Sequence, residues 1–288
     1  MSIKRILCPL YGSPSDMGAL NTGLALTKRF EAQADILFVR PNPTDALPYL
    51  GEGISGPIVE DIIDTARKAA DSAEEQCRAS ASKAAEDAGL ALSDDTQPGT
   101  ASARVRVKAG RAAEVIAAES RLADLVIVAD ASARDQTSGP NALETCMLAE
   151  GRPVLLAPAQ ATTTVGTSVA IGWDESGEAA NAVTAAMPFL TSAAKVTIVC
   201  VDEDGITDAP GARSLAEYLT LHGVKAEIHL VPEDSRNTGE VLLEEASNLK
   251  ADLLVMGGYS HSRLRELVLG GVTRHIRSHA TIPVLMAH

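Results

Sequence analysis

The stretch ADLVIVA at residues 123–129 recurs as ADLLVMG at residues 251–257, and this repeat decides the fold. A second pair, RPVLLAP at 152–158 and IPVLMAH at 282–288, follows the two copies in the same order. Both members of each pair are short and apolar, as expected of strands buried in a sheet. Because similarity between distant segments in the same order marks a duplicated unit, the sequence predicts two tandem copies of one domain.

Each copy begins with an apolar strand, at 4–13 in one half and 167–176 in the other, and continues as strands that alternate with helical stretches. We expect domains at 1–158 and 168–288, joined by the short polar linker 159–167. This alternation is typical of parallel sheets covered by helices on both faces, so the fold class is α/β with two five-stranded, Rossmann-like domains. The expected strands lie near 4–9, 34–39, 103–108, 123–129 and 153–157, and near 168–173, 195–201, 225–231, 251–257 and 282–286.

The composition is that of a folded protein with a small-residue core. Hydrophobic residues make up 45% of the 288 residues and aromatic residues only 3%, so the core must consist of Ala, Val, Ile and Leu. The net charge of −13 works against binding to DNA, RNA or an anionic membrane, because the field of the molecule repels phosphate. An anionic small ligand therefore needs a local positive site.

The sequence contains neither an apolar run long enough to cross a bilayer nor the pattern of a signal peptide, so we expect a cytoplasmic protein. Walker A and G-x-S-x-G motifs are absent, and we therefore expect little or no catalysis, at most weak ATP hydrolysis. The cysteines are scattered without a CxxC pair, which favours buried free thiols over disulfides. They are Cys8, Cys77, Cys146 and Cys200.

The first half carries about 35 extra residues between Pro41 and Thr100. They comprise a Pro- and Gly-rich loop at 41–57 and a long helical pattern with one apolar face. Two interpretations are open: a surface helix packed on its own sheet, or an arm that serves as a lid or a dimerisation surface. The apolar face consists of Ile58, Val59, Ile62, Ile63, Ala66, Ala69, Ala70 and Ala73.

The segment GGYSHSRLRELVLGGVTRHIRSHA, residues 257–280, follows the fourth strand of the second half. Its glycine pairs at 257–258 and 270–271 let the backbone turn and open a helix that begins near Val272. Free N–H groups and the dipole attract phosphate at such a helix start, and ligands of open parallel sheets lie at the carboxyl ends of the strands. The segment is also basic, with His261, Arg263, Arg265, Arg274, His275 and Arg277 against one acid, Glu266.

In this segment the chain resembles the universal stress protein family, whose nucleotide-binding members carry G-x-x-G-x9-G-[ST] after the fourth strand. The spacing is kept here, but Ser260 replaces the second glycine and Gly271 replaces Ser or Thr. The Ser260 hydroxyl is able to donate to phosphate, and Thr273 partly offsets the hydroxyl missing at 271. The resemblance implies an adenine nucleotide alpha hydrolase-like fold and a stress-responsive regulatory protein that binds ATP or a related adenine nucleotide in its second half.

Position by position, the resemblance also implies contacts for that nucleotide. Asp174, after the first strand of the second half, would lie near the adenine and ribose, and the main chain of Val201, ending the second strand, would meet the adenine. The alternative, in which the glycines only turn the chain between a strand and a helix, remains open. The ribose and phosphates would be surrounded by Gly257, Ser260, Gly270, Gly271, Val272 and Thr273.

The first half departs from this pattern. Ala129 and Asp130 stand where the second half has glycines, and only Gly139 remains before the following helix. An aspartate at that turn repels phosphate, and Tyr11 occupies the place of Asp174. We therefore predict that the first half binds no nucleotide.

Three further questions stay open at this level. His275 and His279 have zinc-ligand spacing on the expected last helix, with His261 as a third candidate, but a solvated pair is the alternative. A nucleotide-independent scaffold that binds a protein partner through the long first-half helix is the alternative function. Family members commonly dimerise through their fifth strands, so the resemblance suggests that 152–158 and 282–288 pair within this chain as a pseudo-dimer. Further association into a homodimer is left open.

Overall fold

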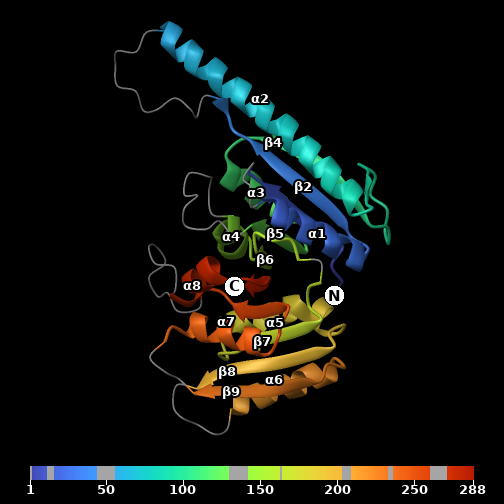
Figure 1. Ribbon diagram of the computed structural model, residues 1–288, viewed down its shortest axis with the longest axis vertical. Helices are drawn as coiled ribbons and strands as arrows, with labels where there is room; N and C mark the ends of the chain where they lie inside the picture. Colours follow the sequence, from blue (N-terminus) through green and yellow to red (C-terminus); the bar gives the residue numbers. More distant parts are fainter. Residues whose placement is uncertain are drawn as a thin grey trace.

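One sheet of 11 strands runs through both halves of the described chain, in the order β3-β4-β2-β1-β5-β6-β11-β10-β7-β8-β9 (Figure 1). Neighbouring strands are parallel except β6 and β11, which pair in antiparallel orientation where the halves meet. The computed structural model describes residues 2–11, 16–43, 56–129, 142–162, 164–202, 209–232, 236–259 and 271–288.

The ten strands expected from the sequence are all present, with ends that differ by at most two residues. Without the short β3, which was not expected, each half has the order 3-2-1-4-5 of a doubly wound sheet, so the duplication extends to the topology. The first half contributes β1 (Arg5–Leu10), β2 (Gln33–Arg40), β3 (Ala91–Leu92), β4 (Ser102–Ala109), β5 (Leu125–Ala129) and β6 (Val154–Ala157). The second contributes β7 (Ser168–Gly172), β8 (Lys195–Asp202), β9 (Ala226–Pro232), β10 (Leu253–Gly257) and β11 (Val284–Ala287).

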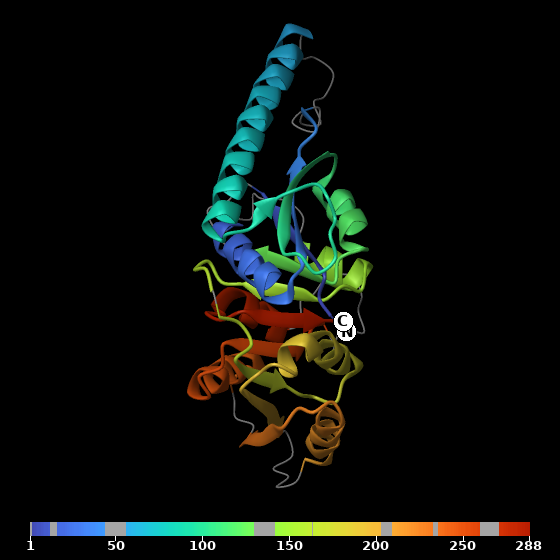
Figure 2. The ribbon, with the colours of Figure 1, turned by 90° about the vertical axis from the view of Figure 1, so that its right-hand side faces the viewer.

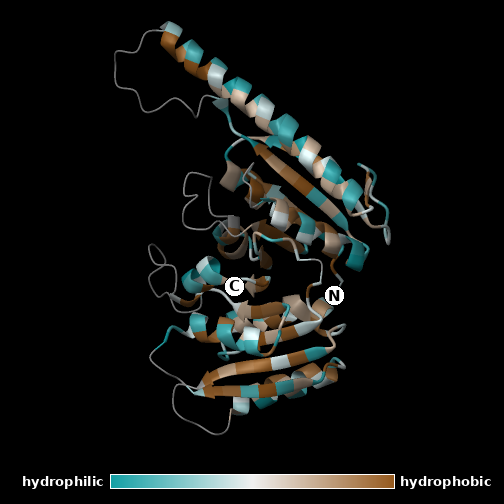
Figure 3. Cartoon of the chain, in the orientation of Figure 1, coloured by the Kyte–Doolittle hydropathy of each residue, from teal (hydrophilic) through white to brown (hydrophobic). Residues whose placement is uncertain are grey.

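Helices cover both faces of the sheet, and each face has one hydrophobic cluster with members from both halves (Figures 1 and 2). The central strands β1, β5, β6, β7, β10 and β11 are therefore largely apolar (Figure 3), as parallel strands between two helix layers must be, whereas the outer strands β4 and β9 also carry charged side chains. One face is covered by α1 (Asp16–Phe30), α2 (Gly56–Asp87), α5 (Gly177–Leu190) and α6 (Pro210–Leu221). The other is covered by α3 (Ala112–Ser120), α4 (Ala142–Glu144) with a π-helix at Thr145–Ala149, α7 (Thr238–Asn248) and α8 (Gly271–His279).

The pairing of the two fifth strands within the chain is confirmed. Leu285 of β11 lies opposite Leu155 of β6 in the antiparallel register. Beside this junction the rings of Phe30 and Phe189 pack edge to face, with centroids 5.1 Å apart. The two halves are thus joined by a strand pair and by an aromatic contact.

The aspartates of the two repeated ADL motifs have the same structural role. Asp252 accepts hydrogen bonds from the three amides of residues 166–168, at 2.9 to 3.0 Å. Asp124 accepts them from the amides of Lys4 and Arg5, at 2.8 and 2.9 Å. Each carboxylate thereby satisfies backbone donors at the start of its half's first strand. The repeat thus preserves a hydrogen-bonding function as well as a strand.

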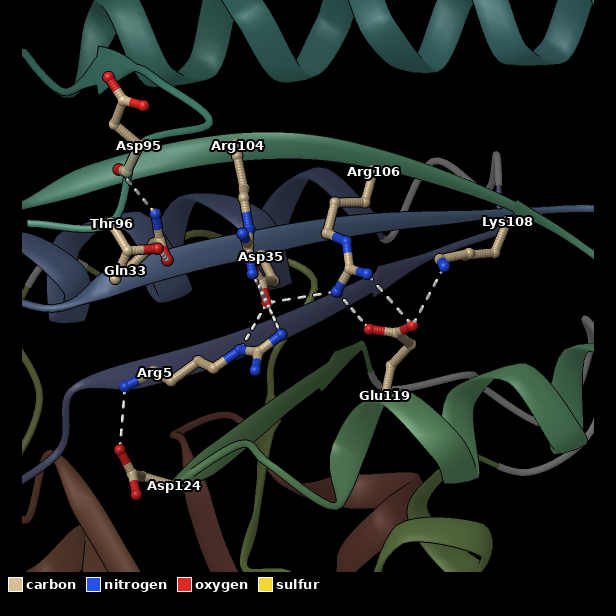
Figure 4. A network of polar contacts seen from close by, with 10 residues as sticks. All are labelled: Arg5, Gln33, Asp35, Asp95, Thr96, Arg104, Arg106, Lys108, Glu119 and Asp124. Carbon is tan, nitrogen blue, oxygen red and sulfur yellow. Dashed lines mark hydrogen bonds and ion pairs between the residues drawn. The ribbon is translucent and has the colours of Figure 1, made fainter.

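A buried aspartate joins three strands of the first half (Figure 4). The Asp35 side chain on β2 is 1% exposed and forms ion pairs with Arg5 of β1 and with Arg104 and Arg106 of β4. Burial alone favours the protonated acid, but hydrogen bonds from Arg104 and Arg5 hold the pKa of Asp35 below its usual range. Glu119 of α3 also pairs with Arg106, so the charges form a network.

α2 packs on the sheet only through its C-terminal half. Its N-terminal end projects beyond the sheet (Figures 1 and 2), and Ile58 there is 54% exposed. Of the apolar face named from the sequence, only Ala70 is buried, so the interpretation as a helix packed along that whole face needs correction. The physical reason is length: 32 residues extend past the strands that α2 covers. No helix in the described ranges is long and apolar enough to cross a bilayer.

The four cysteines are free and buried, as predicted. Burial raises the pKa of the Cys8 thiol to about 12 and that of Cys77, Cys146 and Cys200 to about 11. Because the thiolate is the reactive form, these side chains serve as small core hydrophobes.

Candidate functional site

A pocket of about 200 Å³ lies at the carboxyl ends of β7, β8 and β10. β7 has β10 on one side and β8 on the other, so the pocket lies where the strand order reverses. Open parallel sheets bind their ligands at this point. Six of the eight residues named from the sequence line the pocket: Asp174, Val201, Gly257, Gly271, Val272 and Thr273. The other two, Ser260 and Gly270, lie outside the described residues.

Part of the pocket wall is apolar. Val199 and Val201 come from β8, Leu242 from α7 and Met256 from β10. Trp173, the single tryptophan of the chain, also lines it. The indole Nε1 of Trp173 is buried and has no hydrogen-bond partner within the described part of the chain. An apolar wall of this kind suits a flat heterocycle, which buries its faces against apolar side chains.

Two helices begin at the pocket, α7 at Thr238 and α8 at Gly271. The first amides of a helix have no partner within the helix and carry partial positive charge. Asn237 caps α7 by accepting a hydrogen bond from the Gly239 amide at 2.8 Å. Thr273, in the first turn of α8, is only 3% exposed and lines the pocket. The pocket therefore combines apolar side chains with helix ends that attract an anion.

Asp174 follows β7 and is exposed. Its Oδ1 accepts hydrogen bonds from the amide and the hydroxyl of Ser176, at 3.0 and 2.5 Å. Ser176 in turn caps α5 by accepting from the Ala179 amide at 3.1 Å. Among the residues that the structure describes, none donates to Asp174 Oδ2, so this oxygen is open to solvent beside the pocket.

The glycines after β10 provide space rather than a left-handed turn. A Cβ on Gly257 would lie 2.7 Å from the Ala179 amide nitrogen, and one on Gly258 would lie 2.4 Å from Met147 Cε. The positive φ of this turn, 67°, belongs to Tyr259. The expectation that the glycine pair turns the backbone is corrected accordingly: close approach of the α5 backbone requires Gly257, whereas Gly258 lies against the flexible end of the Met147 side chain.

Tyr11 occupies the corresponding place in the first half. It follows β1 and packs against the hydrophobic cluster on the α3 and α4 face of the sheet. Burial raises the pKa of its phenol, and the hydroxyl is buried without a hydrogen-bond partner in the described ranges. Ala129 ends β5, whereas the positions of Asp130 and Gly139 fall outside the described residues.

The histidines of α8 form no metal site with the other described residues. The rings of His275 and His279 stack with centroids 4.1 Å apart, and His279 Nδ1 is hydrogen-bonded to the His275 carbonyl oxygen at 2.9 Å. No group of three metal-binding side chains occurs in the described part of the chain, and His261 lies outside it. The arrangement observed is a stacked surface pair.

Sequence reasoning did not identify Trp173, Thr238, Leu242 or Tyr259 as pocket residues. The sequence position of Trp173 could have indicated a pocket residue, because it directly precedes Asp174 at the carboxyl end of a strand. The position of Thr238 was less informative: it begins a helix after the capping residue Asn237. Leu242 and Tyr259 had no such indication, since their place in the wall depends on how α7 and the turn after β10 pack.

Comparisons with known proteins agree with this architecture. Residues 167–288 match the model of the universal stress protein family. A sequence search of curated proteins gives no match. The structure is similar to that of a universal stress protein from Archaeoglobus fulgidus DSM 4304, with a TM-score of 0.67, 18% identity, and coverage of 98% of this chain and 97% of that one.

A second solved structure, of a functionally unknown protein from Pseudomonas aeruginosa PAO1, has a TM-score of 0.55 and 12% identity. That match covers 98% of this chain and 92% of the other. At such identities the likeness concerns the fold, and it extends over both halves. In sequence, the universal stress protein family is thus found in the second half of the chain, residues 167–288, and the chain as a whole is similar in fold to a solved universal stress protein.

Proposed function

We propose that this protein binds ATP or a related adenine nucleotide in its second half and acts as a stress-responsive regulatory protein with little or no catalysis. The observation that carries the proposal is the pocket itself. Apolar side chains of β8 and β10 and the starts of α7 and α8 line one cavity at the switch point of the sheet. A ligand with a flat base at one end and an anion at the other fits this combination.

In this proposal the adenine lies against Val199 and Val201, and Asp174 accepts a hydrogen bond from the ribose. The phosphates lie over the first turn of α8, at Gly271 and Thr273. The net charge of −13 makes the helix dipole important, because the protein as a whole repels the anion. The free, buried thiols fit a reducing compartment such as the cytoplasm.

The test uses Trp173 as a reporter, because selective excitation of the single tryptophan observes the pocket wall directly. The full chain is titrated with ATP, ADP, AMP and cyclic AMP while its fluorescence and Tm are followed. We expect a saturable fluorescence change and a rise in Tm, since a ligand that binds only the folded state stabilises it. Absence of both at millimolar nucleotide contradicts the proposal.

A matched pair of variants tests the position of the phosphates. Gly271→Asp places a carboxylate at the start of α8 and is expected to abolish the nucleotide response by charge repulsion. Gly56→Asp is the control, because Gly56 also begins a helix and a Cβ added there meets nothing within 4 Å. Retention of the response in Gly271→Asp removes α8 from the site.

The second candidate function, a nucleotide-independent interaction scaffold, has one observation in its favour. The projecting end of α2 exposes Ile58, and Val59, Ile62 and Ile63 beside it are only partly buried. An unidentified protein partner or a second copy of the chain would bury these side chains. Light scattering of the full chain and of Ile62→Glu over a range of concentrations distinguishes a homodimer from a monomer.

A further inference from the structure

The turn that follows β10 is held partly by the first half of the chain. The Tyr259 hydroxyl lies 3.4 Å from Oε1 of Glu144, a long hydrogen bond to the last residue of α4. The neighbouring Gly258 lies against Met147 of the π-helix, close enough that a Cβ would come within 2.4 Å of Met147 Cε. Two consecutive residues of the turn therefore contact one short segment of the other half.

Glu144 also reaches the helix that begins at the pocket. Nη1 of Arg277 in α8 lies 3.7 Å from the same oxygen, Glu144 Oε1. Tyr259 and the first turn of α8 both line the pocket. One carboxylate of the first half thus stands between two elements of the second-half site.

The phenol of Tyr259 is a donor in this arrangement. Burial, followed by the negative charge of Glu144, holds the pKa of Tyr259 above its usual range, so the hydroxyl remains protonated at neutral pH. The carboxylate of Glu144 then accepts the proton of the hydrogen bond. The Arg277 side chain also interacts with this hydroxyl and acts in the opposite direction on its pKa, so removal of Glu144 leaves Tyr259 beside Arg277 without the carboxylate that joins the two.

Tyr259 also has an unfavourable backbone conformation. Its φ of 67° lies in the left-handed region, which side chains other than glycine rarely adopt. Such a conformation persists only where the surroundings determine it. The contacts from Glu144 and Met147 are part of those surroundings, together with the hydrogen bond from the Gly258 amide to the Ala287 carbonyl at 2.9 Å.

We propose that Glu144 and Met147 are positioning residues for the pocket, so that the first half of the chain controls the conformation, and hence the ligand affinity, of the pocket in the second half. By linkage, the free energy by which segment 142–149 favours ligand binding equals the free energy by which a bound ligand stabilises the contacts of that segment. The affinity part of this inference rests on the proposed function, whereas the contact between the halves does not.

The first measurement titrates the full chain with ATP and follows Trp173 fluorescence. We expect Glu144→Ala to raise the Kd by between about two-fold and thirty-fold, as substitutions that modulate coupling do. Glu144→Gln retains an oxygen acceptor for Tyr259 and should recover part of the loss. Tyr259→Phe should weaken binding, and the double variant Glu144→Ala with Tyr259→Phe should be no weaker than the more damaging single change, because both remove one contact.

The control is Glu150→Ala, which removes an acid from the same region. Glu150 pairs with Arg121 on the surface of the first half and does not line the pocket. We expect a Kd within about two-fold of the wild-type value, because the pair of Glu150 with Arg121 involves neither Tyr259 nor Arg277. An equal loss of affinity in Glu150→Ala overturns the specific role of Glu144.

The second measurement needs no ligand. Amide hydrogen exchange over residues 253–259 should be faster in Glu144→Ala than in the wild type, and unchanged in Glu150→Ala. If the wild type binds no ATP but exchange responds to Glu144→Ala, the proposed function fails and the positioning contact stands. If ATP binds and neither exchange nor affinity responds, the positioning role is overturned and the function stands. If the wild type binds no ATP and hydrogen exchange does not respond to Glu144→Ala, the proposed function and the positioning role both fail.

Discussion

The ends of the first strands in the two halves, at Tyr11 and at Asp174, show how one topology places a buried aromatic ring in one copy and an exposed carboxylate beside a pocket in the other. Both residues follow a strand in the third place of the same 3-2-1-4-5 order. Tyr11 packs against the hydrophobic cluster, whereas Asp174 is exposed beside a pocket of about 200 Å³. The comparison teaches that the residues after the strands differ between two copies with the same strand order, so the strand order alone does not fix the chemistry at this edge of the sheet.

The halves also differ in the side chains that lie inside the sheet. The first half has the charge network around Asp35, whereas the second half has an uncharged threonine at the matching position. In the register of the sheet, Leu7 pairs with Asp35 in one half and Ala170 pairs with Thr197 in the other. Asp35 and Thr197 therefore occupy equivalent positions, which allows a direct comparison of the two cores.

The largest effect is expected for Asp35→Asn. The change leaves three arginines beside a neutral side chain, and breaking a buried ion pair costs about 3–5 kcal/mol. The equivalent Thr197→Val removes only a hydroxyl group and should cost about 1 kcal/mol. Urea unfolding of both variants measures the difference. Equal losses in the free energy of unfolding would mean that the charge network stabilises the first half no more than Thr197 stabilises the second.

The same network predicts acid sensitivity. Because the pKa of Asp35 is lower in the folded than in the unfolded chain, its stabilising contribution is present above the unfolded pKa of about 3.9 and is lost as pH falls through the folded value. Urea midpoints measured between pH 7 and pH 3 should therefore fall more steeply in the wild type than in Asp35→Asn. Parallel pH profiles would contradict this assignment.

A second comparison concerns the repeated aspartates. Asp252→Ala deprives three amides of their acceptor and should cost about 3 kcal/mol, whereas Asp124→Ala deprives two and should cost about 2 kcal/mol. Thermal unfolding measures both. The prediction depends on the larger loss of stability occurring in Asp252→Ala. A larger loss in Asp124→Ala would show that the number of hydrogen bonds does not determine the stability of the two strand starts.

A third, smaller effect concerns ligand affinity. Asp174→Ala removes the carboxylate assigned to the ribose and should raise the Kd for ATP about tenfold, equivalent to one hydrogen bond to a charged group. Trp173 fluorescence reports it. Asp174→Asn keeps the acceptor for Ser176 and is expected to fall between Ala and the wild type, so that damage to the helix cap is separated from loss of the ligand contact.

The smallest effect is expected for Tyr11→Phe. The hydroxyl of Tyr11 is buried without a partner in the described ranges, so its removal should stabilise the chain by about 1 kcal/mol and leave ATP affinity unchanged. Calorimetric unfolding tests the first part and the fluorescence titration the second. A crystal soaked with ATP that shows density beside Tyr11 and Ala129 would refute the prediction that the first half binds no nucleotide.

The duplication and the ten matched strands were available from the sequence. Both depend on local apolar segments such as 123–129 and 251–257, whose length and order are read directly along the chain. The pairing of the fifth strands was implied by the family resemblance. Six pocket residues were also named in advance, through their positions after strands and at a helix start. The family resemblance supplied the roles of these residues, which remain proposals.

The tertiary structure alone decided the rest. Packing between distant elements places Trp173 and Leu242 in the lining of one pocket and brings Gly258 against Met147. It also determines that the N-terminal part of α2 extends beyond the sheet. Glu144 and Tyr259 meet although they are 115 residues apart. Patterns along a chain record which face of an element is apolar, but not which element of the other half will lie against it, because that is set by the assembled sheet.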